Sequence, residues 1–516
     1  MMALSAFALL SVARSPGAIV TWDGGGANAN WETAGNWNIA GTPTKSDSIV
    51  FGVSFSSGTT IDMNGNQTAS SLTISSTSGF TIANGRLTLT SGDLSRSTTS
   101  YGEQIISSAI RIQAAADWNV GGLGFLEISG NLDDSNRTLG FTKTGGGTLI
   151  LSGSVGTDGT LTVNGGTLIL SADNYGGSAE TQMKGNIVVN AGVLNVRHND
   201  ALGTLDGSTR VNAGAALQLQ GGLTMRNEAL TLNGNGVSND GALRNVLNNN
   251  TYTGAITLGS AARINSDSGT LTIDVASGNA ITGSQNLTIG GNGNVTLADP
   301  IATSTGTLTK DGTGTLTLSA ANTYTGTTTV SAGTLVINGN QSSATGAVSV
   351  SGKLAGTGTI GGTTTINAGG TYSPGPIGAV GNQNFTKSLT FANQSIFDWD
   401  LNANSTTSGF DTLSASGNIA VGTTGSIFRI AFGSGVDLNN AFWTTPNATR
   451  VWNLTNIFGK AFSSGSFQSV QTSTDVSQYG SFSITGSALT WTAVPEPSGA
   501  IAGLLIAAGL LRRRRK

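Results

Sequence analysis

The sequence predicts an all-β protein whose main part is a right-handed parallel β-solenoid. Strand-forming Thr, Val and Ile are abundant, and only 10% of residues are charged. Glycine accounts for 76 of 516 residues, about twice its usual share of roughly 7%. Disordered chains are usually rich in proline and charge, whereas this chain has only 8 prolines. We therefore expect many short strands joined by Gly- and Asn-containing turns.

Two segments of the chain repeat each other, residues 143–170 and 310–337. In the first, apolar residues alternate with small or polar ones at Leu149 and Leu151, Leu161 and Val163, and Leu168 and Leu170. This period of two predicts strands with one buried face. A single strand–turn–strand unit cannot bury that face, but stacked units cover one another. We expect such a solenoid over residues 61–375, with an antiparallel sandwich array as the alternative.

The two segments resemble the autotransporter-associated β-strand repeat. Weaker copies lie at residues 188–196, 210–219 and 365–375. The resemblance implies a secreted, passenger-like stalk.

The N-terminal segment predicts export followed by a cap. An apolar stretch at residues 3–12, followed by small residues near Gly17, is typical of a signal peptide, which we place at residues 1–18. A wrongly chosen start is the alternative. Residues 19–60 carry Trp22, Trp31 and Trp37 among Gly and Asn residues. We expect these rings to shield the first edge of the solenoid. The alternative is that they are exposed and stack on sugar rings.

Residues 388–491 predict a separate C-terminal β-domain, because this region is richer in aromatic residues and longer strands. The preceding segment, residues 372–384, contains Pro374 and Pro376 and is the expected boundary.

The last segment, residues 494–516, differs from the rest of the chain. Residues 498–511 carry no charge and would form a helix of about 21 Å, shorter than the hydrocarbon core of a bilayer. The five cations that follow would stop transfer across a membrane: Arg512, Arg513, Arg514, Arg515 and Lys516. Pro495 and Pro497 hold the preceding residues extended. We expect an accessible motif, a short transmembrane-like helix and a cytoplasmic basic anchor.

This order of features resembles the PEP-CTERM sorting signal of Gram-negative bacteria. The resemblance implies recognition of Pro495, Glu496 and Pro497 by an exosortase in the inner membrane, with transient anchoring there. An ordinary C-terminal anchor is the alternative.

Net charge argues against nucleic acid as a partner. The chain carries 24 − 27 = −3, and five of the cations lie at its end, so the remainder carries −8. Nucleic-acid binding needs a basic surface. The absence of cysteine excludes disulfides.

No catalytic, cofactor or metal site is expected. The single histidine, His198, is interpreted as a turn residue, and the adjacent pair Asp133 and Asp134 as a solvated turn. Asp398 and Asp400 would share one face of a strand and could bind Ca²⁺, but that ion needs six or more oxygen ligands.

A glycine-rich stretch, residues 356–362, lacks the Lys-Ser/Thr pair of a phosphate-binding loop. We interpret it as a turn.

These observations favour a non-enzymatic, exported surface or extracellular-matrix protein, a stalk or adhesin. Exopolysaccharide and cell-envelope components are the expected targets. The alternative is a polysaccharide-acting or carbohydrate-binding β-helix protein. An enzyme of that kind would bring acids from successive coils together with a Lys or Arg in a groove.

Overall fold

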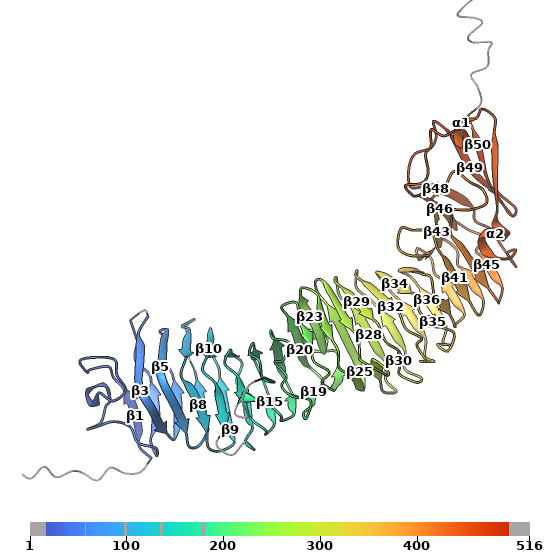
Figure 1. Ribbon diagram of the computed structural model, residues 1–516. Helices are drawn as coiled ribbons and strands as arrows, with labels where there is room; N and C mark the ends of the chain where they lie inside the picture. Colours follow the sequence, from blue (N-terminus) through green and yellow to red (C-terminus); the bar gives the residue numbers. More distant parts are fainter. Residues whose placement is uncertain (1–16, 57, 98–100, 135–137, 177–180, 495–516) are drawn as a thin grey trace, which may run out of the picture. The chain divides into compact units, whose positions relative to one another are not determined.

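The computed structural model describes residues 17–56, 58–97, 101–134, 138–176 and 181–494. The chain divides into two compact units, Met1–Gly254 and Ala255–Lys516. Each unit is built of short strands stacked side by side (Figure 1). Their pairing is parallel through the coils of both units, so the predicted β-solenoid is confirmed and the antiparallel sandwich alternative is wrong. The right-handed sense of the coil stays a prediction.

Unit 1 contains two long columns of parallel strands. The first consists of β1 (Ile19–Trp22), β2 (Ser48–Phe51), β4 (Ser71–Ile74), β6 (Leu94–Arg96), β9 (Ala116–Val120), β12 (Phe141–Thr144), β15 (Leu161–Val163), β17 (Ile187–Val189), β19 (Thr209–Val211) and β22 (Leu230–Gly234). The second consists of β3 (Thr60–Ala69), β5 (Phe80–Leu89), β7 (Gln104–Ile106), β10 (Phe125–Ile128), β13 (Thr148–Leu151), β16 (Thr167–Leu170), β18 (Gly192–Val196), β20 (Ala215–Gln220) and β23 (Leu243–Leu247).

Shorter columns complete the coils of unit 1. From β5 a branch runs through β8 (Ala109–Ile112), β11 (Leu132–Asp134) and β14 (Val155–Gly156), and β21 (Thr224–Met225) pairs with β24 (Asn250–Tyr252). The 3-10 turns η1 (Ala34–Asn36) and η3 (Val237–Asn239) lie in its loops.

Unit 2 repeats this arrangement. One column consists of β25 (Ile256–Ser266), β28 (Leu287–Gly290), β31 (Leu308–Lys310), β33 (Thr328–Val330), β36 (Val348–Val350), β39 (Thr364–Ile366), β42 (Leu389–Phe391) and β45 (Ile419–Val421). Another consists of β26 (Thr270–Ile273), β29 (Asn294–Leu297), β32 (Thr315–Leu318), β34 (Thr334–Ile337), β37 (Lys353–Gly356), β40 (Thr371–Pro374), β43 (Ile396–Leu401), β46 (Ile427–Phe432) and β48 (Ser469–Thr472). Shorter columns are β27 (Ile281–Thr282) with β30 (Ile301–Ala302), and β35 (Asn340–Gln341), β38 (Thr359–Ile360), β41 (Asn382–Phe385) and β44 (Thr412–Ala415).

The alternation of apolar residues sets the interior of the coils. On β13, Leu149 and Leu151 are buried, and they pair in register with Leu168 and Leu170 on β16. Because paired strands lie about 4.8 Å apart, each buried leucine packs on the corresponding residue one coil away. Each repeat in the sequence therefore corresponds to strands that stack in register on those of the neighbouring coil.

The lysine shared by the two repeats is buried, which the sequence pattern did not indicate. Lys143 is fully buried and its Nζ donates to the carbonyl oxygens of Thr144 at 2.8 Å, Gly145 at 2.9 Å and Gly165 at 3.0 Å. Burial lowers the pKa of Lys143 to about 8, so the ammonium form still predominates at pH 7. The three N–H donors of the ammonium thus meet these three carbonyl acceptors, and the carbonyl oxygen of Val120 lies further away, at 3.5 Å. Lys310 repeats this arrangement on Asp311, Gly312 and Ala332.

Asparagines form a second link between coils. Asn190 donates from Nδ2 to Oδ1 of Asn164 at 2.8 Å, and Asn212 donates in the same way to Asn190 at 2.6 Å. Each residue directly follows a strand of the first column, so the amides stack as a ladder at one corner of unit 1. This explains the recurrence of Asn after Val in the weaker repeats.

The parallel coil extends beyond residues 372–384, the expected domain boundary. Pro374 is the last residue of β40, where its missing N–H does not interrupt a strand. The next strand of that column, β43, pairs in parallel with both β40 and β46. Among the strands of the described residues, antiparallel pairing of whole strands begins at β47 (Thr449–Asn453), which joins β50 (Ala488–Ala493) and β49 (Gly480–Thr485) in a three-stranded sheet. Two short helices, α1 (Ala441–Thr444) and α2 (Leu454–Phe458), accompany this sheet.

Residues 1–16 of the predicted signal peptide lie outside the described residues. So do residues 495–516 of the predicted sorting signal, with its transmembrane-like helix. None of the helices in the part of the chain that the structure describes is long and apolar enough to cross a membrane.

Candidate functional sites

The three N-terminal tryptophans form a core rather than a surface. Trp22, Trp31 and Trp37 are at most 3% exposed. Trp37 contacts Trp22 at 5.0 Å and Trp31 at 4.9 Å between ring centroids, with interplanar angles of 86° and 68°. Phe51 on β2 closes the cluster. The rings are neither exposed nor coplanar, so the interpretation of these residues as a sugar-stacking surface is wrong.

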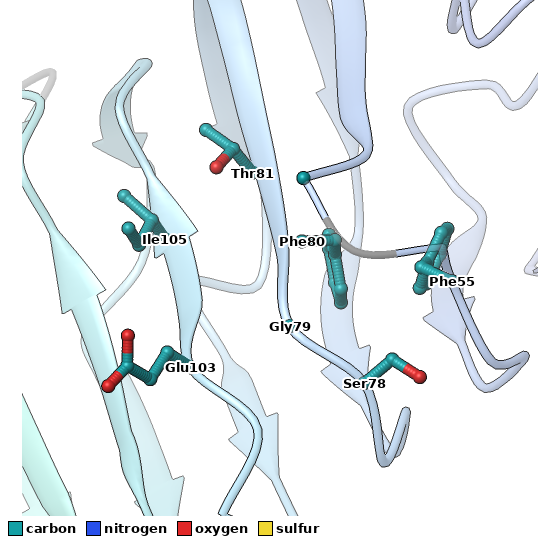
Figure 2. A pocket seen from close by; sticks show the side chains of 8 residues that line it. Phe55, Ser78, Gly79, Phe80, Thr81, Glu103 and Ile105 are labelled. Atoms are coloured by element: carbon teal, nitrogen blue, oxygen red, sulfur yellow. The ribbon is translucent and has the colours of Figure 1, made fainter.

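A cavity of about 500 Å³ lies next to this cluster, beside the half-buried ring of Phe55 (Figure 2). Its lining comprises Phe55, Gly58, Ser78, Gly79, Phe80, Thr81, Glu103 and Ile105. Figure 2 shows the rings of Phe55 and Phe80 on one side of Gly79 and the side chains of Glu103 and Ile105 on the other. The centroids of the Phe55 and Phe80 rings are 4.4 Å apart. An aromatic wall beside hydroxyl and carboxylate groups can bind a small polar ligand that has an apolar face.

Gly79 is required by the close approach of two coils at this cavity. A Cβ at this position would lie 2.8 Å from the backbone oxygen of Glu103. The glycine therefore leaves the floor of the cavity without a side chain.

His198 lies in a turn, as expected, but it is not alone there. Asp173, His198 and Asp200 each carry a potential metal-ligand atom, and these three atoms lie within 4.8 Å of one another. The backbone N–H groups of Tyr175 and Gly176 donate to one oxygen of Asp173, at 2.9 and 2.8 Å. The Gly176 hydrogen bond contributes most to lowering the pKa of Asp173, so this side chain is a carboxylate.

Arg226 and Tyr175 complete this cluster. The guanidinium of Arg226 binds Asp200 and lies 3.8 Å from the centre of the Tyr175 ring. The contributing turns follow β16, β18 and β21 and are about 25 residues apart in the chain. Sequence reasoning missed the cluster because the repeats are decayed here and no longer mark which turns are neighbours.

Asp398 and Asp400 share one face of β43, as predicted, but Asp398 is already paired with two cationic side chains. Its two oxygens bind Nζ of Lys353 at 3.1 Å and Nε of Arg429 at 2.8 Å. Burial would raise the pKa of Asp398, but the hydrogen bonds and charges of Arg429 and Lys353 outweigh it, so the pKa is lowered. Burial and the neighbouring Asp398 raise the pKa of Asp400 to about 6.

This group partly matches the pattern expected of an enzyme, since acids and cations from different coils converge. However, Asp398 and Asp400 are each only 8% exposed, and the ion pairs satisfy Asp398. The arrangement fits a link between coils better than a Ca²⁺ or catalytic site.

Asp133 and Asp134 lie on strand β11, so their interpretation as a solvated turn is wrong. They point to opposite faces, as adjacent strand residues must. Asp133 pairs with Arg111 on β8 at 2.5 Å. Asp134 is buried and accepts from the backbone N–H of Leu139 at 2.7 Å.

The glycine-rich stretch 356–362 is a packing element. A Cβ at Gly356 would lie 2.1 Å from the backbone oxygen of Ile337, and one at Gly358 would lie 2.1 Å from that of Gly339. These glycines let successive coils approach, and β38 (Thr359–Ile360) runs through the middle of the stretch.

Residues 141–170 and 308–337 match the passenger-associated-transport-repeat family. These residues contain β12 to β16 and β31 to β34, so both matches coincide with the two repeats found in the sequence. A search of curated proteins finds no match. The chain thus carries two autotransporter-associated β-strand repeats within a parallel β-solenoid, a combination that fits a secreted, passenger-like or adhesin-like protein.

Proposed function

We propose that this protein is a non-enzymatic, exported stalk or adhesin at the cell surface or in the extracellular matrix of a Gram-negative bacterium. The observation that carries the proposal is the in-register stacking of the passenger repeats: Leu149 on Leu168 in the first copy and Leu316 on Leu335 in the second. Such stacking builds a rigid scaffold from weakly charged coils. Its targets are exopolysaccharide or cell-envelope components.

The route to the surface is the second part of the proposal. Pro495, Glu496 and Pro497 are recognised by an exosortase, while the following apolar segment and the cations 512–516 hold the chain transiently in the inner membrane. The support is the order of motif, apolar segment and basic cluster in the sequence.

Intact mass of the mature protein from its native host tests this route. Loss of the residues after the motif in wild type, but not in Glu496→Ala, is the expected result. Asp274→Ala, which changes an exposed acid in the solenoid, should be processed like wild type. Retention of the basic cluster in all three proteins would contradict exosortase processing. Digestion of intact cells with an external protease then reports whether the solenoid is at the surface.

A carbohydrate-binding role is the second candidate, and the cavity beside Phe55 favours it. The ring of Phe55 can stack on the C–H face of a sugar, and Ser78, Thr81 and Glu103 offer hydrogen-bonding groups. The purified chain should bind exopolysaccharide from its host, and Phe55→Ala should weaken that binding at least tenfold. Tyr101→Ala removes an aromatic ring that is 76% exposed and does not line the cavity, so its binding should be unchanged. Equal binding by all three proteins would exclude this site.

A further inference from the structure

One cluster of side chains in unit 1 is not explained by the proposed function. Only 10% of residues are charged and the chain has a single histidine, yet that histidine lies with two carboxylates on neighbouring turns. We propose that Asp173, His198 and Asp200 bind one zinc ion. The ligand atoms are the second oxygen of Asp173, Nδ1 of His198 and an oxygen of Asp200, and water completes a tetrahedral shell.

The donor set selects the metal. Imidazole nitrogen is a good ligand for zinc and a poor one for Ca²⁺ or Mg²⁺, which prefer oxygen shells. Zinc sites with three protein ligands of His and carboxylate type leave the fourth position to water. Two carboxylates and one neutral imidazole also balance the two positive charges of the ion.

The distances are close to those that zinc requires. Nδ1 of His198 lies 3.9 Å from the nearer Asp200 oxygen. Two ligands of one tetrahedral zinc ion with bonds of about 2.0–2.1 Å lie roughly 3.4 Å apart. All three ligand atoms already lie within 4.8 Å of one another, so side-chain rotation can close the site. The backbone N–H groups of Tyr175 and Gly176 hold one oxygen of Asp173 and leave the other free for the metal.

Two existing contacts compete with the ion. The backbone N–H of Asp200 donates to Nδ1 of His198 at 3.1 Å, and zinc must replace this hydrogen bond. Arg226 binds Asp200, and its charge opposes a cation at the same place. The contact of Arg226 with the ring of Tyr175 does not involve Asp200, so zinc binding to Asp200 leaves Arg226 with this partner.

Bound zinc would link two successive coils. Asp173 follows β16 and His198 follows β18, and these two strands are paired neighbours. The ion therefore ties one turn to the next outside the strands themselves, in a part of the chain that has no cysteine with which to form a disulfide.

The test uses the untagged full chain, because a polyhistidine tag would bind zinc itself. Calorimetric titration with zinc chloride should show one saturable site. Affinity should fall at least tenfold in His198→Gln and in Asp173→Asn, and should rise in Arg226→Ala because the competing cation is gone. Asp274→Asn, a matched change of an exposed acid elsewhere, should bind like wild type.

The single histidine gives an independent measurement. Its ring resonances in an NMR spectrum should shift on addition of zinc and not on addition of magnesium. Absence of saturable zinc binding in both wild type and Arg226→Ala would overturn the proposal. Binding that is equally strong in His198→Gln, or a histidine signal that zinc leaves unchanged, would also overturn it.

Discussion

The ammonium group of Lys143 donates a hydrogen bond to the carbonyl oxygen of Gly165, 3.0 Å away and one coil further along the solenoid. Two further carbonyls, of Thr144 and Gly145, accept from the same nitrogen. The cation therefore joins a turn of one coil to a turn of the next. Since Lys310 occupies the equivalent position in the second repeat, this contact belongs to the passenger repeat itself.

Replacement of this lysine should destabilise unit 1. Lys143→Met keeps most of the buried chain but leaves carbonyl acceptors without a donor, which costs roughly 1–3 kcal/mol for each buried group. The midpoint of urea unfolding should therefore fall clearly. Lys45→Met removes an exposed lysine and is the control. A midpoint equal to that of wild type would mean that water replaces the ammonium at no cost.

Glycines of the repeat should differ sharply in how much their substitution by alanine changes stability. A Cβ at Gly314 would lie 1.8 Å from the backbone oxygen of Gly293, whereas one at Gly146 meets no atom within 4 Å. We expect Gly314→Ala to destabilise unit 2 by several kcal/mol, because backbone of two coils must separate. Gly146→Ala should be neutral or stabilising by about 0.4–1 kcal/mol. Thermal unfolding of both variants checks this, and equal melting temperatures would contradict it. Thr313 already occupies the position equivalent to Gly146 in the other repeat.

Glu228 should make unit 1 less stable at alkaline pH. Burial raises its pKa from 4.5 to about 8, although a hydrogen bond from Thr209 partly offsets this. The folded protein therefore holds a proton that the unfolded chain releases between these two values. Stability from this group is complete below about pH 4.5 and is lost as pH rises to about 8.

Glu228→Gln should remove this dependence, because the amide stays neutral and keeps an acceptor for the Thr209 hydroxyl. Urea midpoints at pH 5 and pH 8.5 should differ less for the variant than for wild type. Asp274→Asn should leave the difference unchanged. If the urea midpoint changed equally between the two pH values in Glu228→Gln and in wild type, Glu228 would already be ionised in the folded protein at pH 5.

Loss of the charge should lower the stability of the protein at Asp398 but not at Asp400. Asp398→Asn leaves Lys353 and Arg429 without their partner and should cost roughly 1–3 kcal/mol. Asp400→Asn should be neutral or stabilising at pH 7.5, because burial and Asp398 already disfavour that charge. Unfolding midpoints of the two variants at pH 7.5 give the comparison. Equal losses would mean that both carboxylates belong to one salt-bridge network.

The alternation of residues such as Leu149 and Leu151 was sufficient to predict strands, their buried face and their stacking. It was not sufficient to place Lys143 inside, because a lysine beside a glycine turn also suits a solvated loop. Pro374 predicts a break in the coil, whereas β40 ends on this proline and its parallel column continues into β43, because a strand can end on proline without losing a hydrogen bond.

The candidate sites depended on contacts that the sequence does not display. Asp173, His198 and Arg226 come together only because their turns are stacked, and the decayed repeats conceal the length of each coil. The tryptophans at positions 22, 31 and 37 could be assigned to a cap from composition, but whether they face water depended on their packing with Phe51.

The Asn164–Asn190–Asn212 ladder has a mechanical consequence. The amides of the ladder bond to the neighbouring coil, as do the paired strands beside them, and Asn212 also accepts from Arg210 in its own coil. A force that pulls on one end of unit 1 would therefore load the outermost coil alone and release the coils singly. A surface protein built in this way would unfold coil by coil under the force of flow. The chain would lengthen gradually, and the protein would stay attached while the remaining coils are still folded.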